Sequence, residues 1–103
     1  MQGPYHSVAD LHGPTAGDWE LRHGLTRGTK YRVAVAFSDA DEYAHAVGEM
    51  WVFVGASFSK FEDEITIFVC RTDKTYWKIP LSWARQRQAS VIENIERHLA
   101  ISS

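Results

Sequence analysis

The stretch AVGEMWVFVGASFSKFEDEITIFV, residues 46–69, carries the strongest folding signal of this chain. Two apolar runs, residues 47–54 and 65–69, flank a connector that is polar and acidic except for Phe58 and Phe61. Short apolar runs that are rich in β-branched and aromatic residues are typical of strands in a small β-domain. We therefore expect each run to form a strand, with most of the aromatic core in or beside this stretch.

The strand expected over residues 47–55 has one face for the core. Trp51 and Phe53 alternate with other residues and should point inward. A glycine inside a strand often marks a bulge, and we expect one at Gly55. Glu49 falls on the same face, so its carboxylate must be paired if it is buried. The candidate partners are Arg32, Lys78 and Arg85.

The connector over residues 56–64 is expected to be a long loop. Phe58 and Phe61 should fold back over one end of the core, because large apolar side chains are usually buried. The acids beside them would then form an exposed, negatively charged tip. This segment is therefore predicted to be a packed lid whose acids are Glu62, Asp63 and Glu64.

Two further strands flank the central stretch. In residues 31–37 (YRVAVAF) and residues 76–81 (YWKIPL), large residues alternate with smaller or polar ones, which predicts half-buried strands. Residues 72–74 (TDK) make a hairpin turn before the second of them. Pro80 indicates an edge position or a strand end, because proline cannot donate to a ladder. The inward residues of the first strand are Tyr31, Val33, Val35 and Phe37.

The C-terminal part is expected to form one helix. The sequence SVIE, residues 90–93, matches a capping box in which Ser90 caps the helix, although a start one turn earlier, within residues 85–89, is also compatible. Arg97 and His98 would lie in the last turn, where the helix dipole favours positive charge. One apolar face is predicted, made of Val91, Ile92, Ile95 and Leu99.

The predicted order is four antiparallel strands followed by a helix. Such an order predicts a mainly β fold with one C-terminal helix, as a small SH3-like barrel or a β-roll. The length of 103 residues fits one domain, which we place at residues 25–101. Residues 1–24 are expected to be a loose N-terminal arm, with a short helical turn over residues 18–24 that Asp18 caps.

Short motifs along the strands and the helix follow a definite order: GTKYRV (28–33), FSD (37–39), VGEMW (47–51), FVG (53–55), FED (61–63), IFV (67–69), IPLSW (79–83) and VIEN (91–94). Their order and spacing resemble a bacterial family that is described only as a domain of unknown function. The resemblance covers residues 25–100. It implies one domain of bacterial, cytoplasmic origin, and it implies no activity, ligand or catalytic residue.

Composition argues against several classes of function. The formal net charge of −2 argues against generic nucleic-acid binding, which needs a basic surface. No apolar run approaches the ~20 residues that span a bilayer, and residues 1–18 lack the basic and apolar regions of a secretory signal. The single cysteine, Cys70, permits no intrachain disulfide and fits a reducing compartment. We therefore expect a cytoplasmic protein without a membrane segment.

No pattern of catalytic or metal-binding residues emerges. The histidines are too far apart in sequence for a zinc site and are expected to be exposed: His6, His12, His23, His45 and His98. The acidic pair in Asp39-Ala40-Asp41 lacks the later glycine and glutamate of a calcium loop. Cys70 lies inside an apolar strand, where cysteine usually packs as a small hydrophobic residue. We expect no catalytic residue, no cofactor and no metal.

Charge segregation is the one feature that points to a binding surface. Residues 39–64 carry seven acids and one base, whereas residues 71–87 carry five bases and one acid. The two segments could simply neutralise each other within the fold, since exposed ion pairs are common and weak. Alternatively, the basic segment, which also holds aromatic residues, binds a partner. The candidate partner-binding residues are Tyr76, Lys78, Trp83, Arg85 and Arg87.

These observations favour a non-enzymatic module that binds another protein. Two other interpretations remain open. The first is nucleic-acid binding through residues 71–87, by base stacking on the aromatic residues. The second is an enzyme with a small-molecule pocket, or an inhibitor protein of the immunity type. The sequence leaves the oligomeric state open, but an exposed edge strand near Pro80 would allow a dimer through edge pairing.

Overall fold

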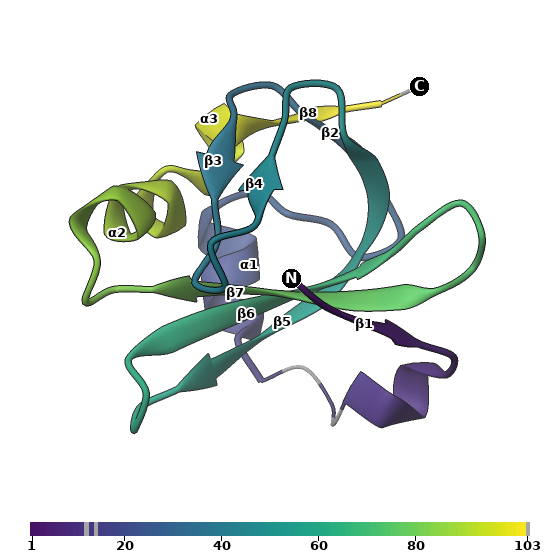
Figure 1. Cartoon of the computed structure of the whole chain (residues 1–103), viewed down its shortest axis with the longest axis horizontal. Helices are drawn as coiled ribbons and strands as arrows, with labels where there is room; N and C mark the ends of the chain where they lie inside the picture. Colours follow the sequence, from purple (N-terminus) through teal and green to yellow (C-terminus); the bar gives the residue numbers. More distant parts are fainter. Residues whose placement is uncertain (12, 14, 103) are drawn as a thin grey trace.

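Three long strands form the centre of the molecule: β5 (Met50–Ser59), β6 (Glu64–Cys70) and β7 (Tyr76–Ser82). The structure, a computed structural model, describes residues 1–11, 13 and 15–102. These strands pair as a continuous antiparallel meander, shown in teal and green in Figure 1. Two of the four predicted strands, those over residues 65–70 and 76–81, are therefore confirmed.

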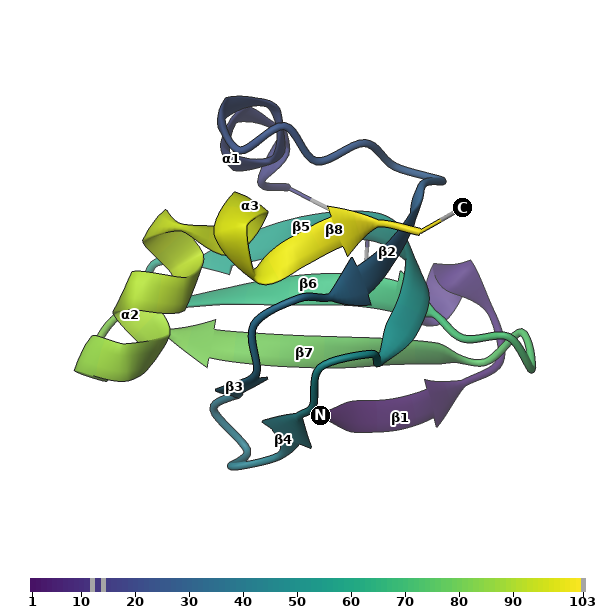
Figure 2. The same ribbon diagram turned by 90° about the horizontal axis from the view of Figure 1, so that it is seen from above.

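Three more strands extend the meander into one antiparallel sheet. They are β1 (Gln2–Tyr5), β2 (Lys30–Val33) and β8 (Leu99–Ile101), and the strand order is β1-β7-β6-β5-β2-β8. A register shift at Gly55 confirms the predicted bulge, and β5 curves strongly so that β2 and β8 fold over the meander (Figure 2). The sheet is curled but open, with β1 and β8 as its edges, so a closed SH3-like barrel is not formed.

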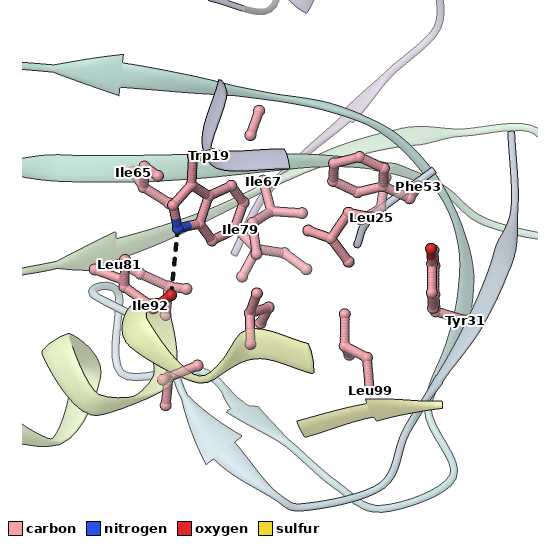
Figure 3. Packing of buried hydrophobic residues seen from close by; sticks show 14 of the residues in the cluster. Trp19, Leu25, Tyr31, Phe53, Ile65, Ile67, Ile79, Leu81, Ile92 and Leu99 are labelled. Carbon is pink, nitrogen blue, oxygen red and sulfur yellow. Dashed lines mark hydrogen bonds between the residues drawn. The ribbon is translucent and has the colours of Figure 1, made fainter. Parts of the chain in front are cut away.

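The core lies inside this curl. Trp51 and Phe53 are fully buried, as predicted, and so are the inward residues of β6 and, in β7, Ile79 and Leu81, whereas Trp77 is only partly buried. The apolar face of the C-terminal helices closes one end, and Trp19 closes another side. The indole Nε1 of Trp19 donates a hydrogen bond of 3.2 Å to the carbonyl of Ile92, which is the dashed line in Figure 3. The predicted helix face, Val91, Ile92, Ile95 and Leu99, is buried as expected.

The N-terminal residues differ from the expected loose arm. β1 pairs with the start of β7, and a short 3-10 helix, η1 (Val8–Leu11), follows it. The helix α1 (Gly17–Arg22) then packs Trp19 into the core. Asp18 lies in the first turn of α1, and Ala16 is the N-cap residue. Pairing with β7 and burial of Leu11 and Trp19 thus hold this segment against the domain.

The strand predicted over residues 31–37 is broken. β2 ends at Val33, and β3 (Phe37–Ser38) begins after a bend and pairs with β4 (Ala44–His45) in a separate two-stranded ladder. The amide of Val35 bonds to the carbonyl of His98 at 3.2 Å, which turns the chain out of the β2 ladder. Val35 is 49% exposed, so the prediction that it faces the core is wrong.

The predicted lid over residues 56–64 is also absent. β5 continues to Ser59, and its pairing with β6 runs to Glu64, which leaves only residues 60–63 as a turn. So short a connector cannot fold back over the core. Phe58 is 42% exposed and Phe61 is 103% exposed, so the prediction that they cover the core is wrong.

The C-terminal segment is two helices and a strand instead of one helix. α2 (Gln86–Glu93) begins one turn before Ser90, so Ser90 is not a cap, and α3 (Ile95–His98) leads directly into β8. Asn94 separates the helices, because its side-chain amide and its backbone N–H both bond to the carbonyl of Ser90. Among the described residues, no helix is long and apolar enough to cross a membrane.

Candidate functional site

A buried cluster of charged side chains lies between the β3–β4 ladder and the start of β5. The imidazole of His45 is fully buried and sits between two carboxylates. Its Nε2 lies 2.8 Å from Oδ2 of Asp39, and its Nδ1 lies 2.5 Å from Oε2 of Glu49. The indole Nε1 of Trp51 donates to the same Glu49 oxygen at 3.1 Å. Glu49 is therefore paired, as burial requires, but with His45 instead of the expected arginine or lysine.

The turn that connects β3 to β4 is built around Asp39. Its Oδ1 accepts hydrogen bonds from the amides of Asp41 and Tyr43, and its Oδ2 lies 2.8 Å from the amino group of Met1. Asp39 thus shapes the turn with one oxygen and binds two cations with the other. Local side-chain hydrogen bonds of this kind are why Asp favours turns.

The protonation state of His45 follows from this geometry. A carboxylate only accepts hydrogen bonds, so both ring nitrogens must donate, which requires the imidazolium form. Burial by itself lowers the pKa of His45, but the hydrogen bonds to Asp39 and Glu49 outweigh it, and the pKa is raised. Burial likewise raises the pKa of each carboxyl, and the hydrogen bond from His45 leads the effects that bring both below their usual values.

This arrangement makes His45 a structural cation. A general base or a metal ligand needs a free ring nitrogen, and both nitrogens of His45 are occupied. Within the described part of the chain, no group of three or more His, Cys, Asp or Glu side chains is placed to hold a metal ion. The cluster instead fixes the wall of a neighbouring groove, because Phe37 stacks on His45 with ring centroids 4.8 Å apart.

The groove itself lies between the β3–β4 ladder and α2. Its volume is about 920 Å³, and Figure 1 shows α2 beside β3. One wall carries Phe37, His45 and small residues of the β3–β4 segment, and the other carries the first turns of α2 with Arg85, Arg87 and Val91. His98 lines the groove as well. The cavity therefore joins apolar surface to two cationic side chains.

Gln88 ties the two walls together. Its side chain is buried, its Nε2 donates to the carbonyl of Asp39 at 3.0 Å, and its Oε1 accepts from the amide of Ser82 at 2.9 Å. Arg85 adds a hydrogen bond of 3.2 Å to the carbonyl of Ala40. The groove is thus held open by satisfied polar contacts and is preformed.

The five predicted partner-binding residues do not form one surface. Tyr76 is the first residue of β7 and Ser82 the last, a separation of about 20 Å at ~3.3 Å per residue. Lys78, near the Tyr76 end, places its Nζ 4.8 Å from the ring centre of Tyr5. Trp83 follows the other end of β7, but it faces Phe58 and donates to Glu93 at 3.2 Å. Only Arg85 and Arg87 line the groove.

The predicted exposure of the histidines holds only in part. His6 is exposed, whereas His23 and His98 are partly covered and His45 is fully buried. His12 lies outside the described residues. The error at His45 arises because its burial depends on Asp39, six residues earlier, meeting Glu49, four residues later. The one signal in the sequence was Glu49, whose face required a buried partner.

The two charge segments do not neutralise each other by direct contact. Among the described residues, no ion pair joins an acid of residues 39–64 to a base of residues 71–87. Arg85 instead donates a hydrogen bond to the backbone carbonyl of Ala40. Cys70 is a partly buried free thiol whose Sγ lies 3.6 Å from the carbonyl oxygen of Arg71.

Comparison with known proteins gives a fold relationship and nothing chemical. The fold is similar to that of an integron cassette protein from the mobile metagenome of Vibrio cholerae, with a TM-score of 0.72 and 19% sequence identity, over 77% of this chain and 90% of that one. No protein-family model and no curated protein matches the chain. The resemblance to a bacterial family of unknown function therefore stays a prediction.

Proposed function

We propose that this chain is a non-enzymatic, cytoplasmic module that binds a partner protein through the groove beside α2. The occupant would be an acidic segment of the partner with an apolar side chain as its anchor. The observation that carries the proposal is that Arg85 and Arg87 line a preformed cavity that also has apolar walls.

The size of the groove suits a short segment of chain. Pockets for drug-sized ligands measure about 300–1,000 Å³, and the groove, at about 920 Å³, lies near the top of that range. Phe37 and Val91 line the groove, and both are almost fully buried, so the apolar part of the wall is held in place by its own packing. Binding would therefore not have to order the side chains of the groove, which reduces the entropy cost of binding.

The charge of the groove selects an acidic occupant. Neither Arg85 nor Arg87 is paired with a carboxylate among the described residues, and both side chains are exposed. Guanidinium groups bind carboxylates in a two-pronged geometry that lysine cannot match. His45 adds no free charge, because its two N–H groups are already bonded to Asp39 and Glu49.

Nucleic-acid binding has less support from the same geometry. Binding of single strands needs rings that are free to stack beside the cations. Tyr76 and Trp83 lie at opposite ends of β7, and Phe37 in the groove is covered by His45. An oligonucleotide therefore serves as the competing ligand in the test.

Selection from a random peptide library displayed on phage tests the proposal. We expect enrichment of sequences that combine Asp or Glu with a large apolar residue. In fluorescence anisotropy, Arg85→Glu and Arg87→Glu should each weaken binding of a selected peptide by about tenfold, which is ~1.4 kcal/mol. Lys74→Glu is the matched control, because Lys74 is exposed in the turn at the other end of β7 and its reversal should leave affinity unchanged.

Two results would contradict the proposal. One is a set of selected peptides without excess acidic residues. The other is undiminished binding by both arginine variants. Tighter binding of an oligothymidine than of any selected peptide would favour the nucleic-acid interpretation instead.

A further inference from the structure

The turn between β5 and β6 presents an aromatic side chain to solvent. Phe61 is 103% exposed, although a polar residue would fit so short a turn equally well. Lys60 precedes it and Glu62 follows it, and both are exposed. Phe61 is thus an apolar knob between a cation and an anion.

A small pocket lies beside the strand pair that flanks this turn, where Phe58 pairs with Ile65. Its apolar walls are Trp19, Phe58, Ile65 and Trp83, and its rim is formed by Thr15, which precedes α1, and by Asp18 and Arg22 of α1. The ring of Phe58 meets that of Trp83 edge-on at 5.3 Å, and the bond from Trp83 to Glu93 fixes the indole. The walls are therefore set before anything enters.

The volume of this pocket argues for a single side chain. It measures about 270 Å³, which is below the ~300–1,000 Å³ of pockets for drug-sized ligands. Aromatic rings pack favourably edge-on or offset against other rings, so a phenylalanine suits these walls. The Phe61 of the same chain does not fill it, because that ring is fully exposed.

The charges at the rim match those beside Phe61. Asp18 and Arg22 are four residues apart on α1, so they lie on one side of the helix, and both are exposed. An incoming tip can set Lys60 against Asp18 and Glu62 against Arg22. The knob and the pocket thus complement each other in shape and in charge, and every copy of the chain carries both.

We propose that two copies of this chain associate about a two-fold axis, each inserting Phe61 into the Trp19–Phe58–Trp83 pocket of the other. A two-fold interface uses the same patch on both copies, as a knob and a pocket on one hairpin allow. A membrane is a poorer occupant, since the acids after Phe61 would be repelled by anionic lipids. The association goes beyond the peptide-binding groove, which lies on the β3–β4 side of α2.

The contact is small, so the dimer should be weak. Stable interfaces bury about 1,200–2,000 Å² in total, and two inserted side chains with their rims fall short of that. Sedimentation velocity over a range of protein concentrations should therefore show a reversible monomer–dimer equilibrium. Phe61→Ser should leave only monomer without affecting folding, because the side chain makes no contact in its own chain.

Matched variants separate this interface from other modes of association. Val47→Ser removes another exposed apolar residue from a turn and should leave the equilibrium unchanged. Arg22→Glu should weaken the dimer at least threefold, and the double variant Arg22→Glu with Glu62→Arg should restore it. A wild-type protein that stays monomeric at every concentration overturns the proposal, and so does a Phe61→Ser variant that dimerises as well as the wild type.

Discussion

Two groups of acidic residues in this chain differ in burial. Asp39 and Glu49 are largely buried and share the imidazolium of His45, whereas Glu62, Asp63 and Glu64 lie on or beside an exposed turn. Burial and repulsion by Glu62 and Asp41 raise the pKa of Glu64, while the pKa values of Asp39 and Glu49 are lowered. The comparison shows that an acidic segment is buried where a cation is available to pair with it. The number of acids in the segment does not decide this.

Removing the cation beside each group of acids should lower the free energy of unfolding for the buried group, Asp39 and Glu49, and hardly change it for the exposed group, Glu62, Asp63 and Glu64. His45→Leu removes the cation that the two carboxylates share and leaves Asp39 with Met1 and Glu49 with Trp51. Breaking a buried ion pair costs about 3–5 kcal/mol. Lys60→Leu, the matched change beside the exposed acids, should alter the free energy of unfolding by less than ~0.5 kcal/mol. Urea unfolding monitored by tryptophan fluorescence measures both. Equal losses in the two variants would refute the distinction.

Neutralising one acid in each segment should give effects of opposite sign. Glu49→Gln removes a charged acceptor from His45 and Trp51 and should destabilise the fold by about 1.5–3 kcal/mol. Glu64→Gln relieves repulsion and should stabilise it slightly, within ~0.5 kcal/mol. Thermal unfolding of the two variants at pH 6 measures the difference. Stabilisation by Glu49→Gln would mean that the carboxylate is not needed to balance His45.

Changes in pH should have smaller effects than these substitutions, and stability should fall both at high pH and at low pH. The raised pKa of His45 adds stability that is complete below its unfolded pKa of about 6.5 and is lost as pH rises through the folded pKa. The raised pKa of the Met1 amino group acts in the same direction at higher pH. The lowered pKa values of Asp39 and Glu49 add stability that is present above about pH 4.3 and is lost as pH falls through their folded values.

Stability should therefore be greatest between about pH 4.3 and 6.5, with a slope of at most ~1.4 kcal/mol per pH unit for each proton. Urea midpoints measured across this range check the profile. In His45→Gln the decline that begins above pH 6.5 should shrink. A variant whose profile is as steep as that of the wild type would show that another group causes the decline.

Parts of this fold with local periodicity were predictable from sequence. The alternation in β6 and β7, the turn at residues 72–74 and the apolar face of the C-terminal helices follow from the spacing of large residues. The inward placement of Trp51 and the bulge at Gly55 follow in the same way. These elements pair with neighbours in sequence, so local pattern and final contact agree.

The rest depended on contacts between distant residues. β1 and β8 are short and have no pattern of their own, and each becomes a strand only because a partner lies beside it. Asn94 ends α2 through hydrogen bonds that an apolar pattern does not reveal. Arg85 and Arg87 line the groove, but the partner-binding role expected for them stays a prediction, and His45 was missed because its burial is a tertiary effect.

The sheet register also orders the assembly of the molecule. Short turns connect β5, β6 and β7. In contrast, β1 pairs with β7 through Gln2 and Lys78, and β2 pairs with β8 through Tyr31 and Ile101, which are far apart in sequence. Contacts between residues far apart in sequence have a higher loop-closure cost than short turns and form more slowly. During synthesis β1 can pair only after β7 has been made, and β8 is made later than β7. We therefore expect the meander of β5, β6 and β7 to form first and the two outermost strands, β1 and β8, to pair with the sheet last.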